Sequence, residues 1–310
     1  MKTVSLILFL FSNFMYAQIQ FDIDTSYTVQ STFKKEKIKF PFLEIVKEQN
    51  YEDVIQIKDL VYKKLETRAL HLDAFYKNEK TKLPAVILIH GGGWKSGNKS
   101  QMQFMAQAIA SKGYSCFAIE YRLSPEAKYP AAILDVKSAI KFIKSNAEKF
   151  NVDPSRIAVL GCSSGGQMAA LIGTTNENSA FEDKDDWSQD AKVQAIINMD
   201  GILAFKHPES QEGKAASLWL GGTYEEKPET WQQASALTHT DKNTPPILFI
   251  NSDMIRFHAG RDNMIEILVK NGIYNEVQTI KNSPHSFWFF NPWFDEMIHY
   301  TTQFLDKVFK

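Results

Sequence analysis

Short apolar runs alternate along the chain with segments of helical periodicity. The run LPAVILIH at residues 83–90 is rich in β-branched residues and ends at three glycines, as expected of a strand buried on both faces. In residues 130–148, by contrast, Ile133, Val136 and Ile140 recur at the spacing of one helix face. This repeated alternation predicts an α/β fold in which a mostly parallel central sheet is covered by helices on both faces. The predicted strands are residues 83–90, 114–120, 156–160, 193–199, 247–251 and 276–280, and the predicted helices are residues 103–111, 130–148, 264–270 and a C-terminal helix.

Two segments interrupt the alternation. Residues 201–241 are polar and aromatic by turns, and we interpret them as a lid-like insertion over the top of the sheet, where lids and substrate walls are usual. Residues 33–47 form a front extension to which no element is assigned. No obvious linker divides the rest, so residues 18–310 are expected to form a single domain.

The N-terminus has the pattern of a cleavable secretory signal. Lys2 precedes the apolar stretch 4–11, Ala17 stands before Gln18, and the apolar run is too short to span a bilayer as a helix. Residues 1–17 are therefore predicted to be a signal peptide, and the mature protein to be secreted or periplasmic with no membrane association. A retained membrane anchor is the alternative.

Composition narrows the possible partners. The 310 residues carry 35 basic and 36 acidic side chains, for a formal net charge of −1. Such a balance offers no basic surface for phosphate backbones, so nucleic acid is not an expected partner. Cys116 and Cys162 occur in no CxxC motif or Cys/His cluster, so neither a disulfide framework nor a metal site is predicted. The expected partner is a neutral or small molecule.

One serine has the sequence context of a nucleophile. The motif GCSSG at residues 161–165 matches GxSxG, follows the predicted strand 156–160 directly and precedes a helix-compatible segment. A serine on a tight strand-to-helix turn needs small neighbours, which Gly161 and Gly165 provide. Ser163 is therefore the predicted nucleophile.

A glycine-rich loop follows an earlier strand and reads HGGGW at residues 90–94. Glycines there let backbone N–H groups point at a developing oxyanion, so the N–H groups of Gly92, Gly93 and Ser164 are the predicted oxyanion donors. A plain glycine-rich turn is the alternative, and a phosphate loop is disfavoured because the GxxxxGK[ST] spacing is missing. His90 is expected to hold the loop through its ring nitrogens.

Candidates for the general base and for the catalytic acid follow the later predicted strands. His285 is the one of seven histidines that lies between the last predicted strand and the final helix, where a general base is expected. Asp253, two residues after the strand 247–251, is the predicted acid, with Asp262 and Asp200 as alternatives, because spatial position decides this role. For each aspartate the alternative role is a helix cap or a solvated loop charge.

Aromatic residues crowd the segment after His285. Residues 286–294 read SFWFFNPWF, and Trp94 flanks the glycine-rich loop. Flat aromatic faces suit sugar rings, so Trp94 and Trp288 are the candidate substrate-binding residues, whereas core packing is the alternative for the cluster.

Together these motifs resemble those of a known family. From about residue 61 to the C-terminus the chain is similar to α/β-hydrolase esterases of the hormone-sensitive-lipase-like and acetyl-xylan-esterase or feruloyl-esterase-like bacterial group, in the segments HGGGW, YRLSPEAKYPAAILDVKSAIKFI, NVDPSRIAVLGCSSGGQMAA, PPILFIN and SPHSF. The resemblance implies the α/β-hydrolase fold, Ser163 as nucleophile, His285 as base, the oxyanion donors named above and no cofactor. One departure leaves the acid open, because INSDMIRFHAGRD stands where these esterases commonly show HGxxDxxVP.

The activity implied by the resemblance is that of a secreted serine esterase. Its expected substrates carry acetyl or similar small acyl groups on plant-type polysaccharide or its oligosaccharides, and they are cleaved through an acyl-enzyme. A general short-chain carboxylesterase or lipase-like enzyme is one alternative. A catalytically inactive binding module of the same fold is another, although it is disfavoured because both Ser163 and His285 are present.

Overall fold

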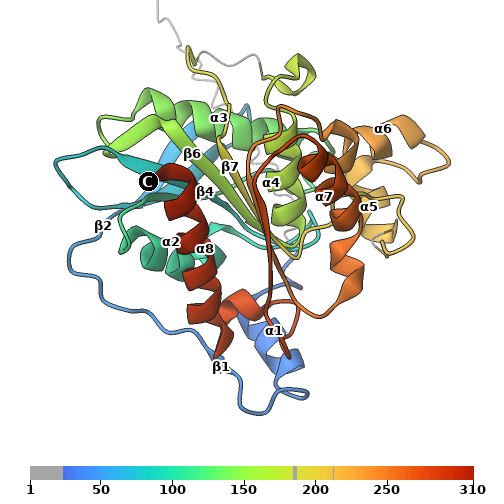
Figure 1. Ribbon diagram of the computed structural model, residues 1–310, viewed down its shortest axis with the longest axis horizontal. Coiled ribbons are helices and arrows are strands. Elements are labelled where there is room, and N and C mark those ends of the chain that lie inside the picture. The colour runs from blue at the N-terminus through green and yellow to red at the C-terminus, as the bar shows by residue number, and fades with distance from the viewer. Residues whose placement is uncertain (1–23, 184–186, 212) are drawn as a thin grey trace, which may run out of the picture.

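An eight-stranded sheet forms the centre of the protein (Figure 1). The computed structural model describes residues 24–183, 187–211 and 213–310, so the predicted signal peptide at residues 1–17 lies outside the described residues. The strands are β2 (Ile55–Lys64), β3 (Ala69–Tyr76), β4 (Leu83–Ile89), β5 (Ser115–Ile119), β6 (Val152–Cys162), β7 (Ala195–Met199), β8 (Ile247–Asn251) and β9 (Asn275–Thr279). Their order is β2-β3-β5-β4-β6-β7-β8-β9, with antiparallel pairing of β2 to β3 and of β3 to β5 and parallel pairing elsewhere.

Helices cover both faces of this sheet, as the sequence predicted (Figure 1). The helices α3 (Ala131–Ser145), α4 (Ser164–Thr174) and α7 (Arg261–Lys270) share one apolar cluster with Ile87 and Ile89 of β4. On the other face, α2 (Gln103–Ala110) and α8 (Trp293–Phe309) share a second cluster with Val86 and Leu88. Alternate residues of one strand thus enter opposite layers, which explains why the buried strands lack a polar face. No helix in the described ranges is both long and apolar enough to cross a membrane.

The front extension, to which the sequence assigned no element, folds onto the C-terminal part of the chain. The helix α1 (Val29–Glu36) begins at Thr28, whose Oγ1 accepts a hydrogen bond from Ser31 N at 3.0 Å, while Ser31 Oγ accepts one from Thr28 N at 2.9 Å. The short strand β1 (Glu44–Ile45) then pairs antiparallel with β10 (Phe290–Asn291), which lies just before α8. The extension is therefore attached to the segment that follows His285.

The segment at residues 201–241 leaves the carboxyl end of β7. It contains α5 (Gly213–Leu220), α6 (Pro228–Gln233) and a 3-10 helix, η3 (Ala236–His239). Its Trp219 stacks on Trp94, with ring centroids 5.1 Å apart, and its Ala234 carbonyl accepts a hydrogen bond from Gln167 Nε2 at 2.8 Å. The insertion therefore packs on the glycine-rich loop and on α4, and its role as a lid stays a prediction.

Glycines allow the closest contacts between α4 and the sheet. A Cβ atom at Gly161 would overlap the backbone of Gly165, and one at Gly165 would overlap the carbonyl of Ile89. Both obstacles are backbone atoms in the centre of the fold, which cannot move aside as the end of a long side chain can. These two glycines therefore determine how closely the start of α4 packs against the ends of β4 and β6.

We expect Gly165→Ala to destabilise the protein by about 1–3 kcal/mol, the usual cost of overpacking. Gly213→Ala is the matched control, because an added Cβ at this first residue of α5 would meet no heavy atom within 4 Å. Alanine has the higher helix propensity, so the control should be neutral or stabilising. Urea unfolding followed by circular dichroism measures both variants, and equal stabilities would contradict the packing argument.

Candidate active site

Ser163 occupies a sharp turn between β6 and α4. Its backbone has φ 55° and ψ −121°, and its N–H donates to the carbonyl of Met199 at 2.8 Å. A positive φ is unfavourable for a residue with a Cβ, so the turn persists only because the surrounding contacts hold it. The serine stands at the strand-to-helix turn that the sequence predicted.

The structure brings Ser163, His285 and Asp200 into one hydrogen-bonded chain. His285 Nε2 lies 2.8 Å from Ser163 Oγ, and His285 Nδ1 lies 2.9 Å from Asp200 Oδ2. Because an ionised carboxylate only accepts, Nδ1 carries the proton and Nε2 is left to accept from the serine hydroxyl. This is the arrangement in which a histidine can take up the proton of a serine nucleophile.

Asp200 is fully buried at the end of β7. Its Oδ1 accepts from Ser252 N at 2.8 Å and from Asn251 Nδ2 at 3.3 Å, and its Oδ2 accepts from Ser252 Oγ at 2.5 Å as well as from His285. Buried charge is costly without such partners. The four donors therefore allow a carboxylate to be held inside the protein.

The expected pairing of Asp253 with His285 is wrong. Asp253 is exposed, and its Oδ2 accepts a hydrogen bond from Asn282 N at 2.7 Å, so it braces the loop that leads to His285. Asp262, the second alternative, is 75% exposed and pairs with Arg261. The physical reason lies in strand order: β7 is the neighbour of β6, which ends just before Ser163, whereas β8 is one strand farther away.

Aromatic rings fix the imidazole of His285. Phe257, in the 3-10 helix η4 (Ile255–His258), stacks on it with ring centroids 3.4 Å apart and planes 9° apart, and Trp288 meets it edge-on at 5.2 Å. Such contacts restrict rotation of the ring about its side-chain bonds. The ring is therefore held in the plane that serves both of its hydrogen bonds.

The predicted substrate-binding role of Trp94 and Trp288 is not supported by their position. Each side chain is 2% exposed. Trp94 donates from Nε1 to Gln167 Oε1 at 3.0 Å and stacks on Trp219, so no face is open to a sugar ring. The cluster of aromatics after His285 is core, which was the alternative interpretation; its buried members are Phe287, Trp288, Phe289, Phe290, Trp293 and Phe294.

A second histidine approaches Asp200 from η4. His258 Nε2 donates to the Ser252 carbonyl at 2.9 Å and lies 3.8 Å from Asp200 Oδ1. Burial lowers the pKa of His258, which keeps the ring neutral at neutral pH. A neutral His258 leaves the charge of Asp200 available to His285.

The glycine-rich loop lies across from Ser163. Gly92 has φ 130° and Gly93 has φ 59°, and both line the same pocket as Ser163. A Cβ at Gly92 would overlap the carbonyl of Ser96, so the loop can take this path only with glycine there. Ser164 opens α4, where backbone N–H groups have no partner within the helix. The three predicted oxyanion donors thus surround the serine, although their catalytic role stays a prediction.

His90 holds the glycine-rich loop through hydrogen bonds and a stacked ring. Its Nδ1 donates to the Gly91 carbonyl at 2.9 Å, its ring stacks on Tyr121 at 4.3 Å, and the Tyr121 hydroxyl donates to the His90 carbonyl at 2.9 Å. Burial lowers the pKa of His90 to about 4. The sequence-based expectation of a structural histidine agrees with these contacts.

A pocket of about 570 Å³ opens above the serine. Its lining includes Gly92, Gly93, Ser163 and His285, together with residues of α1 and of η4. The involvement of α1 was missed by sequence reasoning, because a short polar helix far from any catalytic motif carries no signal of its position. The sequence also missed Ser252, which follows β8 and donates to Asp200, and Phe257 of η4, which stacks on His285.

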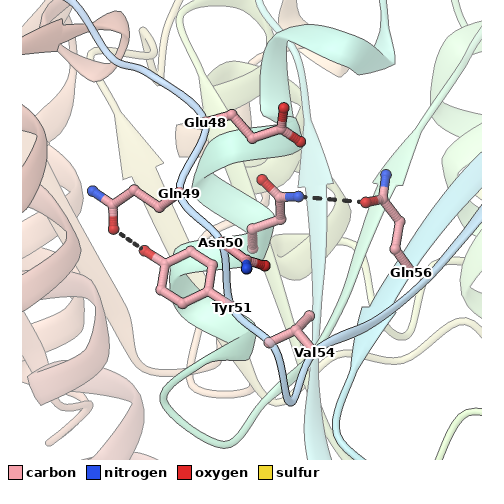
Figure 2. Close-up of a pocket in the computed structure, with 7 residues that line it drawn as sticks. Glu48, Gln49, Asn50, Tyr51, Val54 and Gln56 are labelled. Atoms are coloured by element: carbon pink, nitrogen blue, oxygen red, sulfur yellow. Dashed lines mark hydrogen bonds between the residues drawn. The ribbon is translucent and has the colours of Figure 1, made fainter.

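A second pocket, of about 440 Å³, has a different character (Figure 2). Its polar lining holds neither a serine nor a histidine, and the Tyr51 hydroxyl donates to Gln49 Oε1 at 2.6 Å within it. No nucleophile and base therefore meet there. Across the described ranges, no group of three or more His, Cys, Asp or Glu side chains could hold a metal ion.

We expect Asp200→Asn to lower kcat on a chromogenic acetate by about 10³–10⁴-fold, because an amide cannot hold His285 in the required tautomer. Asp253→Asn is the matched control and should change kcat by only a few fold, since its carboxylate braces a turn. Steady-state kinetics and circular dichroism measure activity and folding. A large loss in the control with a folded protein would contradict the assignment.

We expect His90 to make the protein sensitive to acid. Its folded pKa of about 4 lies below the ordinary value of 6.5, so its stabilising contribution is present above pH 6.5 and is lost as pH falls toward 4, by up to about 3 kcal/mol. His90→Asn, which keeps a donor near Nδ1, should lose less stability between pH 7 and pH 4.5 than the wild type loses. Urea unfolding across this range tests it, with the exposed His299→Asn as control; identical pH slopes for wild type and His90→Asn would refute the account.

Known proteins are similar to this chain in sequence and in fold. The chain is 29% identical to Esterase LipC from Mycobacterium tuberculosis over 220 residues, which are 68% of this chain and 53% of LipC. A truncated form of carbohydrate esterase from gut microbiota superposes with a TM-score of 0.69 at 24% identity, covering 84% of this chain and 100% of that chain. A bifunctional GH43-CE protein from Bacteroides eggerthii gives a TM-score of 0.68 at 25% identity, covering 83% of this chain and 36% of that chain.

The chain spans about half the length of LipC and of a second curated relative, the probable carboxylic ester hydrolase LipM from the same organism. The BD-FAE family model matches residues 72–266, more than half of the chain. The matched region contains Gly92, Gly93 and Ser163, which line one pocket, and the buried Asp200, which is hydrogen-bonded to His285. The protein therefore belongs to the BD-FAE family and has the α/β-hydrolase fold.

Proposed function

We propose that the protein is a serine esterase that removes small acyl groups, above all acetyl, from esters of carbohydrate alcohols. The single observation that carries the proposal is the hydrogen-bonded chain from Ser163 through His285 to Asp200 at a pocket of about 570 Å³. Membership of the BD-FAE family and similarity to Esterase LipC support ester hydrolysis as the reaction.

The first half of the reaction forms an acyl-enzyme. His285 Nε2 takes the proton of Ser163 Oγ as the oxygen attacks the ester carbonyl, and the N–H groups of Gly92, Gly93 and Ser164 stabilise the oxyanion. Asp200 holds the imidazole and stabilises the imidazolium that forms. The imidazolium then protonates the leaving alcohol oxygen, and the C–O bond breaks.

The second half restores the enzyme. His285 takes a proton from water, the resulting hydroxide attacks the acyl-serine carbonyl, and the same N–H groups stabilise the second oxyanion. Collapse of this intermediate releases the carboxylic acid, and Ser163 Oγ recovers its proton from His285. No other reactant is required.

Hydroxyl groups along the pocket support a carbohydrate alcohol as the leaving group. The pocket contains six hydroxyl-bearing side chains besides the nucleophile and four apolar ones, unlike the apolar groove that a long acyl chain needs. The hydroxyl-bearing residues are Ser26, Tyr27, Ser31, Thr32, Ser283 and Ser286, of which Tyr27 is the aromatic member. Export through the predicted signal peptide would bring such an enzyme to extracellular polysaccharide.

We expect the purified protein to release acetate from acetylated xylan and to hydrolyse p-nitrophenyl acetate at least tenfold faster than the octanoate, since a long apolar chain would have to pack against the hydroxyl groups of the lining. Ser163→Ala should abolish both activities. Acetate release and nitrophenol absorbance are the measurements. Faster octanoate cleavage would favour the lipase-like alternative, and no hydrolysis of any ester would favour the inactive binding module.

A further inference from the structure

The second pocket, of about 440 Å³, is separate from the one above Ser163. Among the described residues the two pockets share no lining side chain. Its volume falls within the roughly 300–1,000 Å³ of ordinary small-molecule sites. The proposed ester hydrolysis makes no use of it. Its lining comes from α2, from the edge strand β2 and from the segment before β2, and consists of Glu48, Gln49, Asn50, Tyr51, Val54, Gln56 and Gln107.

Two glutamines on one wall of the second pocket are incompletely hydrogen-bonded. Gln107 Nε2 donates to Gln56 Oε1 at 3.4 Å. Gln107 Oε1 and Gln56 Nε2 are buried and have no hydrogen-bond partner among the described residues, and the whole of Gln107 is only 7% exposed. A buried amide group without a partner costs free energy, so such groups are rare in native proteins. The pair therefore offers one unused acceptor and one unused donor beside a cavity.

The unused donor and acceptor together match a hydroxyl group. A hydroxyl is a small neutral group that both donates and accepts a hydrogen bond. The match holds for either orientation of the two amides: if both turn over, the bond between Gln107 and Gln56 reverses, and one donor and one acceptor are again unused. Because the last torsion of a glutamine side chain is soft, both amides can turn toward a hydroxyl in the pocket.

The segment before β2 forms the other wall and is fixed to the protein core. Tyr51 and Val54 pack against the apolar cluster to which α2 and α8 contribute. The Tyr51 hydroxyl donates to Gln49 Oε1 at 2.6 Å, which holds this amide beside the pocket. Figure 2 shows Asn50 on the same wall, with Gln56 on the opposite side. The pocket is therefore preformed, which reduces the entropy lost when a ligand binds.

The composition of the lining disfavours most classes of ligand. In the part of the chain that the structure describes, this lining contains no lysine, arginine or histidine, so it offers no cation to a phosphate or carboxylate. Val54 is its one aliphatic residue, so an apolar ligand would gain little there. The other lining groups are amides, the Tyr51 phenol and the Glu48 carboxylate, all of which hydrogen-bond to hydroxyls. A neutral ligand with several hydroxyl groups fits this set best.

We propose that the second pocket binds a neutral sugar unit of a carbohydrate chain, and that Gln107 and Gln56 hydrogen-bond to one of its hydroxyl groups. The choice of a carbohydrate rests in part on the proposed function, in which the same class of molecule carries the ester. The pocket binds the sugar without cleaving it, because its lining contains no nucleophile and base. A polymer held there keeps its ester groups at a raised local concentration around the enzyme.

Calorimetric titration with unacetylated xylohexaose, cellohexaose and mannohexaose tests the proposal, because these neutral oligosaccharides carry no ester to be cleaved. We expect saturable binding of at least one of them to the wild type. The same binding should persist after Ser163 has been blocked with phenylmethylsulfonyl fluoride, which occupies the catalytic pocket. Absence of saturable binding for all three would overturn the proposal and indicate that water serves the two amides. Loss of binding after the block would overturn it too, because the sugar would then lie above Ser163.

Variants assign the binding to the two amides. Replacing both glutamines, in the double variant Gln56→Met with Gln107→Met, should weaken oligosaccharide binding about fivefold or more, the scale of one or two neutral hydrogen bonds. The midpoint of urea unfolding should stay equal or rise, because exchanging both partners of a buried polar pair for apolar groups leaves no amide unpaired. Gln103→Met is the matched control, since it lies one turn earlier on α2 and outside the lining, and it should bind as the wild type does.

The outcomes separate this inference from the proposed function. A stable double variant that binds as tightly as the wild type would overturn sugar recognition by the amides. If the double variant is destabilised, Gln56→Met alone, on the edge strand β2, decides the matter, and unchanged binding in it would overturn the proposal. All variants should keep the wild-type kcat on p-nitrophenyl acetate. A wild type that binds an oligosaccharide but hydrolyses no ester would instead refute the esterase proposal and leave the sugar site standing.

Discussion

The backbone turn at Ser163 is the constraint on which the site depends. Its φ of 55° would relax in an unconstrained chain, and it persists because α4 is pressed against the ends of β4 and β6. Gly161 and Gly165 permit that approach, since a Cβ at either position would overlap backbone atoms. The turn directs the serine hydroxyl toward His285, 2.8 Å away, and starts α4 with Ser164.

The order of the strands determines where Asp200 and its hydrogen-bond donors lie relative to Ser163. Asp200 ends β7, whose Met199 pairs in register with Cys162 of β6, just before the nucleophile. The end of β8, next to β7, then supplies Ser252, which gives Asp200 two hydrogen bonds. Neighbouring strands thus provide the carboxylate and the groups that keep it buried, while the loop after β9 delivers His285.

The N-terminal extension lines the pocket and is attached to the elements that build the active site. It is joined to the glycine-rich loop through Ser96, to the segment after His285 through Ser286, and to β10 through β1. Each attachment is to an element that already has a role at the site. The residues that line the pocket from the N-terminal extension are therefore held by the loops that carry the predicted oxyanion donors and His285.

The sequence by itself determined the parallel sheet, the position of Ser163 at a strand-to-helix turn and the loop that bears His285. These features leave local signals: β-branched runs for strands buried on both faces, and glycines where a Cβ cannot fit. Only the tertiary structure decided that Asp200 rather than Asp253 reaches His285, because two aspartates after neighbouring strands look alike until strand order is known. It also decided that Trp94 and Trp288 are core residues and that α1 lines the pocket, since burial and contact across more than a hundred residues of chain depend on packing rather than on local pattern.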